Sequence, residues 1–269
     1  MNNFMVQNQV HVNIPFNWLY ESYLKIFIEK KLNPEIGFDA KALDSFTSGI
    51  VDCNEIALKF HKSNLAITLH GPFMDLSPGS PDPYIRKITK YRFKQLLKLI
   101  PIFKPKSIVC HTGYDVKRYG FIYDEWSGNL IDTFLWFGEE VIKKGSKLMI
   151  ENVYEKNPSE IKFLFKKLEH LGVSFCFDIG HQSAFSDSPL EDWVKELGAY
   201  IGQLHLHDNF GKKDDHIAMG KGIINFPKFF DMLKIQKKTI PILTLEPHRE
   251  EELWPSLVYL DKMWPWEKG

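Results

Sequence analysis

The chain has 269 residues, 44% of them hydrophobic, so it is long enough to bury a large core. Lysine plus arginine and aspartate plus glutamate number 34 each, which excludes an overall basic field that would attract nucleic acid or an anionic membrane. The three cysteines, Cys53, Cys110 and Cys176, lie far apart without a CxxC pair, which argues against a disulfide framework or a thiolate zinc site.

Short apolar runs rich in β-branched and aromatic residues alternate with longer stretches of helical periodicity, a pattern typical of βα units and a parallel sheet. The expected strands, in chain order, are Gln9–Ile14, Pro34–Phe38, Leu65–His70, Ser107–His111, Lys147–Glu151, Val173–Asp178, Ile201–His207 and Ile240–Glu246. Between them the clearest helices are Tyr84–Ile100, Ile161–Leu171 and Pro227–Lys237. Pro158-Ser159-Glu160 is a typical helix start.

No linker, low-complexity segment or internal repeat divides the sequence. Eight strands and eight helices therefore predict a single domain over residues 1–269, a closed (βα)8 TIM barrel. The alternative is an open, doubly wound sheet, which needs a glycine-rich phosphate-binding turn after an early strand. The segment after Ile14 reads Pro15-Phe16-Asn17 instead, which favours the barrel.

Six of the expected strands carry an ionisable residue at or near their C-terminal ends. These residues are His70, His111, Glu151, Asp178, His205 and Glu246. In a barrel the C-terminal strand ends gather at one rim, and residues two apart on a strand share a face, so we expect these side chains to point into the barrel. Alternation places inside with them Thr68, Ser174, Cys176, Gln203 and Thr244.

The combination of acids and imidazoles at this rim predicts a bound cation. A single buried histidine is more often a hydrogen-bonded core residue than a ligand. Buried carboxylates, however, are costly unless they are paired or bind a cation, and Glu151, Asp178 and Glu246 converge with His205. Imidazoles and carboxylates without thiolates suit Zn²⁺, Mn²⁺, Co²⁺ or Fe²⁺ alike, so the sequence predicts a divalent metal without selecting one.

The segment HLHDNFGKKDDHIAMGKG, residues 205–222, adds Asp208, Asp214 and His216 after the seventh strand. Its Gly220-Lys221-Gly222 stretch precedes an expected helix, where backbone N–H groups and the lysine would bind a phosphate of the substrate. A flexible turn with a solvated lysine explains the same stretch equally well.

Seven short motifs follow one another along the chain. They are HGPF at His70, HTG at His111, IEN around Glu151, FDIGH around Asp178, HLHD at His205, DDHIAMGKG from Asp214 and LEP around Glu246. In this order they resemble the superfamily of xylose-isomerase-like TIM barrels, which also contains the AP-endonuclease family 2 enzymes. The resemblance covers about two-thirds of the chain and is specific to the superfamily, not to one reaction.

The resemblance to the sugar isomerase and epimerase branch implies one ion held by Glu151, Asp178, His205 and Glu246. In that branch Glu151 and Glu246 would also be the acid and base that move a proton next to a carbonyl. His181 would hold a substrate hydroxyl.

The resemblance to the endonuclease branch implies a larger set of ligands and up to three ions. In addition to the same four residues, this set contains His70, His111, His181, Asp214 and His216. One ion takes four to six ligands, so nine residues require either several ions or a role for some of them in substrate binding. This branch predicts a multi-zinc phosphoesterase acting on abasic-site DNA or another phosphodiester.

Two observations on the substrate point in opposite directions. The balanced charge favours a small molecule over DNA, and the proline-rich segment 71–84 is stiff enough to form the wall of a small pocket. Phe73 and Met74 in the same segment favour DNA, because the nucleases carry residues there that enter the duplex. We expect a metal-dependent sugar or sugar-phosphate isomerase or epimerase; the nuclease is the alternative, and a barrel that only binds sugar is a further one. The expected substrate contacts are His181, His216, Lys221 and Phe73.

The sequence also bears on the location of the protein and on the roles of a few further residues. The segment MNNFMVQNQV lacks the layout of a secretory signal and no 18 apolar residues run together, which with the isolated cysteines predicts a cytoplasmic protein without a membrane partner. Glu35, near the end of the second strand, is a plausible substrate contact. The segment near the C-terminus with Trp254, Trp264 and Trp266 is expected to close the barrel with its last helix and to cover the edge or bottom of the barrel with its tail. The sequence leaves the oligomeric state open.

Overall fold

The computed structural model of the protein describes residues 6–236 and 239–266. Parallel strands pair in chain order and close into a barrel, because the eighth strand pairs with the first. The strands are β1 (Val10–Pro15), β2 (Asn33–Gly37), β3 (Thr68–His70), β4 (Ile108–His111), β5 (Leu148–Glu151), β6 (Ser174–Asp178), β7 (Ile201–Leu206) and β8 (Ile242–Leu245). The predicted (βα)8 fold is confirmed.

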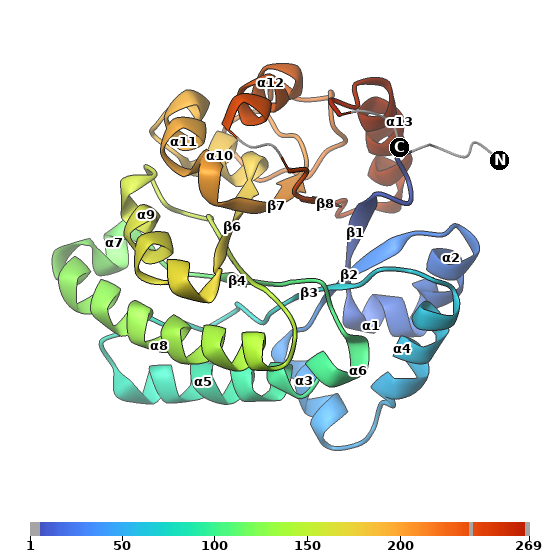
Figure 1. Ribbon diagram of the computed structural model, residues 1–269, viewed down its shortest axis with the longest axis horizontal. Coiled ribbons are helices and arrows are strands. Elements are labelled where there is room, and N and C mark those ends of the chain that lie inside the picture. The colour runs from blue at the N-terminus through green and yellow to red at the C-terminus, as the bar shows by residue number, and fades with distance from the viewer. Residues whose placement is uncertain (1–5, 237–238, 267–269) are drawn as a thin grey trace.

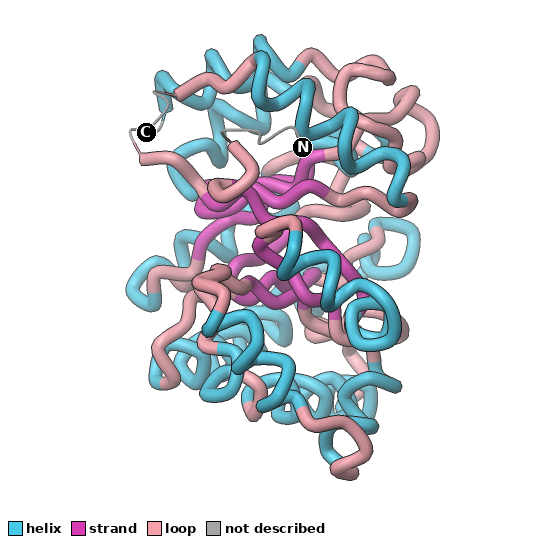
Figure 2. The backbone as a smooth tube through the Cα atoms, turned by 90° about the vertical axis from the view of Figure 1, so that its right-hand side faces the viewer, coloured by secondary structure: helices cyan, strands magenta, loops and turns pink. Residues whose placement is uncertain are grey.

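Helices follow one another around the strands in chain order and form the outer layer (Figure 1). They are α1 (Phe16–Trp18), α2 (Leu24–Glu29), α3 (Ala40–Thr47), α4 (Cys53–Lys62), α5 (Pro83–Leu97), α6 (Ile100–Phe103), α7 (Val116–Tyr119), α8 (Tyr123–Lys143), α9 (Ser159–Lys167), α10 (Ile179–Phe185), α11 (Leu190–Leu197), α12 (Phe226–Gln236) and α13 (Glu250–Lys262). Short helical turns are η1 (Leu19–Tyr23), η2 (Gly120–Ile122), η3 (Glu169–Leu171) and η4 (Gly198–Tyr200). Turning the molecule by 90° shows the strands in the middle with helices on their outer sides (Figure 2).

Period-two alternation on the strands separates two cores, as the sequence predicts. Outward residues such as Leu69, Phe177 and Leu204 belong to the large apolar core between strands and helices. Inside the barrel a small apolar cluster of Val109, Met149 and Cys176 lies among polar side chains. The barrel interior is therefore polar toward one end, which is where the ionisable strand ends gather.

The pairing register places the ionisable ends next to one another. Residues 111 and 151 are partners across β4 and β5, and residues 178 and 205 are partners across β6 and β7. Because partners in a parallel ladder lie at the same height, their side chains meet at one rim of the barrel.

The predicted helices are present, with shifted boundaries. The helix expected over Tyr84–Ile100 ends at Leu97, and α6 begins as a separate helix at Ile100. Pro101, near the start of α6, has no N–H to continue a helix from α5. Several connections contain more than one helix, so the expected number of eight was too low for the outer layer. Lys237, the expected end of a helix, lies outside the described residues.

Three smaller expectations concern the surface and the cysteines. None of the described helices combines the length and the apolar character needed to span a bilayer. The three cysteines are buried and free. Trp264 is buried, and its ring contacts that of Trp266, which in turn contacts Phe230 of α12.

Candidate metal centre and active site

Four ionisable residues from neighbouring strands meet at the rim. Glu151 ends β5, Asp178 ends β6, His205 lies in β7 and Glu246 directly follows β8. His205 Nδ1 lies 3.2 Å from Glu151 Oε1, 3.0 Å from Glu246 Oε1 and 3.9 Å from Asp178 Oδ2. All four are buried, and one ligand atom of each lies within 4.8 Å of the others. We call these four residues the carboxylate quartet; their role as metal ligands stays a prediction.

His70 and His111, at the ends of β3 and β4, contact the same quartet residue. Their Nε2 atoms each lie 3.1 Å from Glu151 Oε2 and 3.1 Å from each other. The other oxygen of Glu151, Oε1, faces His205 Nδ1 and lies 3.3 Å from His181 Nδ1. Glu151 therefore joins two groups of ligand-type side chains through its two oxygens.

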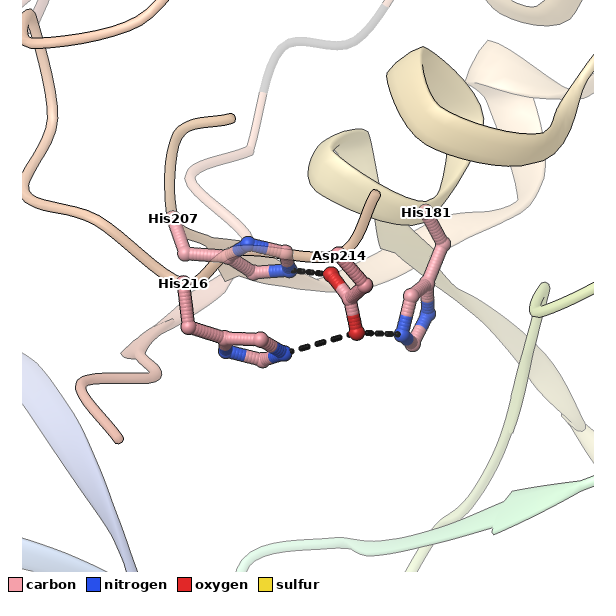
Figure 3. Close-up of side chains that lie close together, drawn as sticks. All are labelled: His181, His207, Asp214 and His216. Carbon is pink, nitrogen blue, oxygen red and sulfur yellow. Dashed lines mark hydrogen bonds and ion pairs between the residues drawn. The ribbon is translucent and has the colours of Figure 1, made fainter. Parts of the chain in front are cut away.

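A third cluster surrounds Asp214. Its Oδ2 lies 2.9 Å from His216 Nε2 and 3.3 Å from His181 Nε2, and its Oδ1 lies 3.6 Å from His207 Nε2. The rings of His207 and His216 stack with centroids 3.7 Å apart, and His181 approaches the carboxylate from the other side (Figure 3). We call His181, His207, Asp214 and His216 the imidazole group. The structure thus brings together all nine residues that the sequence proposed as ligands.

The FDIGH motif explains why Asp178 and His181 lie side by side. Asp178 ends β6 and is also the N-cap of α10, where its Oδ1 accepts the N–H of His181 at 2.7 Å. An N-cap aspartate binds the backbone two or three residues later, so this spacing holds the imidazole beside the carboxylate. Asn152 fixes Asp178 further, because its amide exchanges two hydrogen bonds of 2.9 Å with the Asp178 backbone.

His207 is a member of the site that the sequence analysis did not name. Its Nε2 lies 3.1 Å from Asp178 Oδ1, so it links the imidazole group to the quartet. Gly180 makes room for it, since a Cβ at that glycine would lie 2.0 Å from His207 Cε1. The signal was in the sequence: His207 stands two residues after His205, and alternation places both on the inner face.

Positive neighbours hold Glu151 and Asp178 of the quartet in the ionised form. Burial acts to raise the pKa of Glu151, but the imidazoles of His205 and His111 outweigh it and hold that pKa well below its usual range. Burial acts to lower the pKa of His205, yet the surrounding carboxylates of Glu246, Glu151 and Glu35 raise it well above its usual value. The rim therefore requires positive charge, which imidazolium groups or a divalent cation would provide.

In the imidazole group, too, neighbouring side chains outweigh the effect of burial on a pKa, and one residue has a strained backbone. Burial acts to raise the pKa of Asp214, but hydrogen bonds with His181 and His216 lower it far below its usual value. His216 has a φ of 48°, in the left-handed region that side chains with a Cβ rarely adopt, and its Nδ1 lies 2.9 Å from the carbonyl oxygen of Glu246. Strained residues of this kind are concentrated at functional sites.

The donor atoms fit divalent cations. The quartet offers three carboxylates and one imidazole, and the imidazole group offers three imidazoles and one carboxylate. Buried polar atoms normally have hydrogen-bond partners, but in the described part of the chain His207 Nδ1 and Asp214 Oδ1 have none. The His70, His111 and Glu151 set is a further candidate for an ion. Imidazoles of this kind suit ions such as Zn²⁺ or Fe²⁺, and carboxylates suit Mn²⁺.

The residues expected to bind substrate lie in two different places. The ring of Phe73 stacks on that of His111 at 4.6 Å and is nearly half exposed, at the edge of the cluster. Lys221 points to α13, where its Nζ lies 2.8 Å from Glu252 Oε2. The N–H groups of Gly220 and Gly222 both bind Asp208 Oδ2, so they serve the loop and give no support to the expected phosphate-binding turn.

Glu35 does not face a substrate, contrary to expectation. It is fully buried inside the barrel and lies 2.9 Å from the Nε2 atom of His205, on the side of that ring away from the quartet. Burial acts to raise the pKa of Glu35, but His205 lowers it to about 2. Because Glu35 has no exposed surface, a substrate could not reach it, so the substrate-contact prediction is wrong.

The fold and the rim together define a TIM barrel whose strand ends carry a metal-type ligand cluster. A family model described as "Xylose isomerase-like TIM barrel" matches residues 34–263. The chain belongs to this family, which confirms the resemblance seen in the sequence motifs.

Individual relatives agree with this assignment. The chain is 30% identical over 237 residues to the uncharacterized protein MJ1614 of Methanocaldococcus jannaschii, covering 82% of this chain and 88% of the relative. It is 24% identical over 212 residues to a D-psicose 3-epimerase of Ruminiclostridium cellulolyticum, covering 69% and 67%. The crystal structure of a D-tagatose 3-epimerase-like protein superimposes with a TM-score of 0.80 at 21% identity, covering 95% of this chain and 97% of that chain. This last likeness shows the fold alone.

Proposed function

We propose that the protein is a divalent-metal-dependent isomerase or epimerase that acts on a sugar or sugar phosphate by proton transfer next to a carbonyl. The observation that carries the proposal is the placement of two glutamates around one imidazole. Glu151 from β5 and Glu246 after β8 approach His205 Nδ1 to 3.2 and 3.0 Å. An ion held by the quartet would therefore have a carboxylate from each of two separate strands beside it.

In this proposal the two glutamates exchange a proton with the substrate carbon, one removing it and the other returning it. A bound divalent ion would supply positive charge to the carbonyl oxygen. His181, whose Nε2 lies 3.3 Å from Asp214 Oδ2, would orient a substrate hydroxyl. Phe73, stacked on His111, would form an apolar wall that limits water at the reacting carbon.

The relatives support a carbohydrate substrate. A D-psicose 3-epimerase is among the curated proteins that match this chain, and a crystal structure of such an enzyme with D-tagatose, from Clostridium cellulolyticum, has a TM-score of 0.74. At 24% and 16% identity these matches favour the reaction class without selecting one sugar.

The test is solvent-proton exchange. The protein, loaded with Mn²⁺, Co²⁺ or Zn²⁺, is incubated in D₂O with a panel of ketoses and ketose phosphates that includes D-psicose and D-tagatose. We expect deuterium at the carbon next to the carbonyl, detected by NMR, and its loss in Glu246→Gln. If no member of the panel incorporates deuterium with any of the three ions, the isomerase proposal fails.

A second candidate function is supported by one further observation. Glu151 belongs both to the quartet and to the set with His70 and His111, and the imidazole group lies beside them. A site for several ions favours phosphoester hydrolysis, as in the endonuclease branch. Elemental analysis of protein purified without chelator separates the cases: about one ion per chain supports isomerisation. Two or three ions, with cleavage of abasic DNA, would establish the phosphoesterase.

A further inference from the structure

His205 has a carboxylate on each side of its ring. Its Nδ1 faces the quartet, at 3.0 Å from Glu246 and 3.2 Å from Glu151. Its Nε2 lies 2.9 Å from Glu35 Oε1, a close polar contact that is not a well-aligned hydrogen bond. The imidazole is completely buried, so water does not compete for either nitrogen.

Glu35 is held in place by a network that spans the barrel interior. Its Oε2 accepts hydrogen bonds from Thr68 Oγ1 and Thr244 Oγ1, both at 3.0 Å, and from the side-chain amide of Gln203. Its Oε1 accepts from Asn13 Nδ2 at 3.1 Å. Donors from four strands thus fix a fully buried carboxylate beneath the quartet. Such a group is costly to bury, so a structural role alone would be met more cheaply by a neutral side chain.

We propose that Glu35 is a positioning residue that keeps the proton of His205 on Nε2 and so leaves Nδ1 as the nitrogen that binds the ion. The inference rests on the proposed function, because it concerns the ion that the quartet would hold. A neutral imidazole has one N–H, and the partner of that N–H decides which nitrogen is free to be a ligand. Ligating histidines commonly have a carboxylate or carbonyl behind them in this way, and its loss lowers metal affinity 10- to 100-fold.

The first experiment compares ion affinity in near-isosteric variants. Glu35→Gln keeps the shape of the side chain but replaces one carboxylate oxygen with an NH₂ group. In one orientation of the amide this NH₂ group faces the hydrogen-bond donors of the interior, and in the other it faces His205. We expect Zn²⁺ and Mn²⁺ to bind 10- to 100-fold more weakly, measured by competition with a chromophoric chelator. Thr244→Val is the matched control, because it removes one donor to Glu35 and leaves the contact with His205 intact. This control should lower the melting temperature while ion affinity stays within about threefold of the wild type.

The second experiment uses the wild-type chain and does not depend on a variant folding. Long-range ¹H–¹⁵N NMR of histidine-labelled protein distinguishes the two tautomers of a ring. With Zn²⁺ bound, His205 should carry its proton on Nε2. A proton on Nδ1, or equal ion affinity in wild type and Glu35→Gln, would overturn the inference. Weaker binding in Thr244→Val to the same degree as in Glu35→Gln would also overturn it, since Glu35 would then act only through the packing of the interior.

These results are separable from the test of function, since neither depends on turnover of a sugar. If the chain binds an ion but Glu35→Gln binds it equally well, the inference about Glu35 fails and the proposed function stands. If the wild type binds no divalent ion at all, the proposed function fails and this inference fails with it.

Discussion

The carboxylate quartet and the imidazole group lie side by side but are built in opposite ways. The quartet comes from strand ends, where the pairing register fixes the side chains, and it is rich in negative charge. The imidazole group takes Asp214 and His216 from the long segment between β7 and α12, where Asp208 ties the segment together. An acidic set fixed by strands suits proton transfer and ion binding, whereas a set of imidazoles that a loop completes suits substrate orientation or a second ion.

The largest expected effect tests whether the quartet and the imidazole group have different roles. If the proposed function is right, Glu246→Gln should lower turnover by about 10²- to 10⁴-fold, because it would remove a general acid or base at the reacting carbon. Asp214→Asn, the matched acid-to-amide change in the imidazole group, should mainly raise KM. Steady-state kinetics on the substrate found by deuterium exchange would measure both. Equal losses of turnover in the two variants would mean that the groups act as one unit, as a multi-ion phosphoesterase requires.

The second prediction concerns the buried charge beneath the quartet. Burial acts to raise the pKa of Glu35, but His205 outweighs it and lowers that pKa from its ordinary value of 4.5 to about 2 in the folded protein. A carboxyl with a lowered folded pKa contributes stability that is fully present above its unfolded pKa and is lost as pH falls from there through the folded value. The contribution is on the order of 3 kcal/mol, lost between about pH 4.5 and 2.

Urea unfolding at a series of pH values would measure this acid limb. In Glu35→Gln the limb should be shallower over the same range, because the variant has no proton to take up at that position. An unchanged slope would show that other carboxylates of the rim, and not Glu35, control acid stability.

A third prediction sharpens the contrast between donor types. Three imidazoles with one carboxylate favour Zn²⁺, and three carboxylates with one imidazole suit Mn²⁺ better. An ion present at 100 times its Kd stabilises the folded protein by about 2.7 kcal/mol, which is visible as a rise in Tm. Asp214→Asn should reduce the rise caused by Zn²⁺ more than that caused by Mn²⁺, and Glu246→Gln should do the reverse. If each variant loses the rise in Tm caused by Zn²⁺ and the rise caused by Mn²⁺ to the same degree, the two donor sets do not select between the ions.

The fold and the quartet were predictable because they follow from local patterns. Each apolar run shows its own period of two, and in a parallel barrel every strand end lies at the same rim, so Glu151, Asp178 and His205 could be placed together without knowing the register. The same alternation extends to His207, two residues after His205, although β7 itself ends at Leu206.

The features that the sequence did not predict depend on contacts between distant segments. Glu35 could be located near a strand end, but its pairing with His205 needs β2 and β7 to face each other across the barrel. Likewise the Gly220-Lys221-Gly222 stretch resembles a phosphate-binding turn, yet Asp208 takes its N–H groups. No local pattern distinguishes an N–H that is free for a ligand from one that a carboxylate of the same loop already binds.

The smallest expected effect tests how tightly the imidazole group is packed. Gly180→Ala would bring a Cβ to 2.0 Å from the ring of His207, so either that ring or α10 must move, at about 1–3 kcal/mol in the free energy of unfolding. Gly128→Ala is the matched control in α8, where an added Cβ meets nothing within 4 Å; it should stabilise the helix by about 0.5–1 kcal/mol. Urea denaturation of both variants measures the difference. A Gly180→Ala protein as stable as the wild type would mean that His207 moves freely. The imidazole group would then be an adaptable loop site, in stronger contrast to the quartet than the packing now indicates.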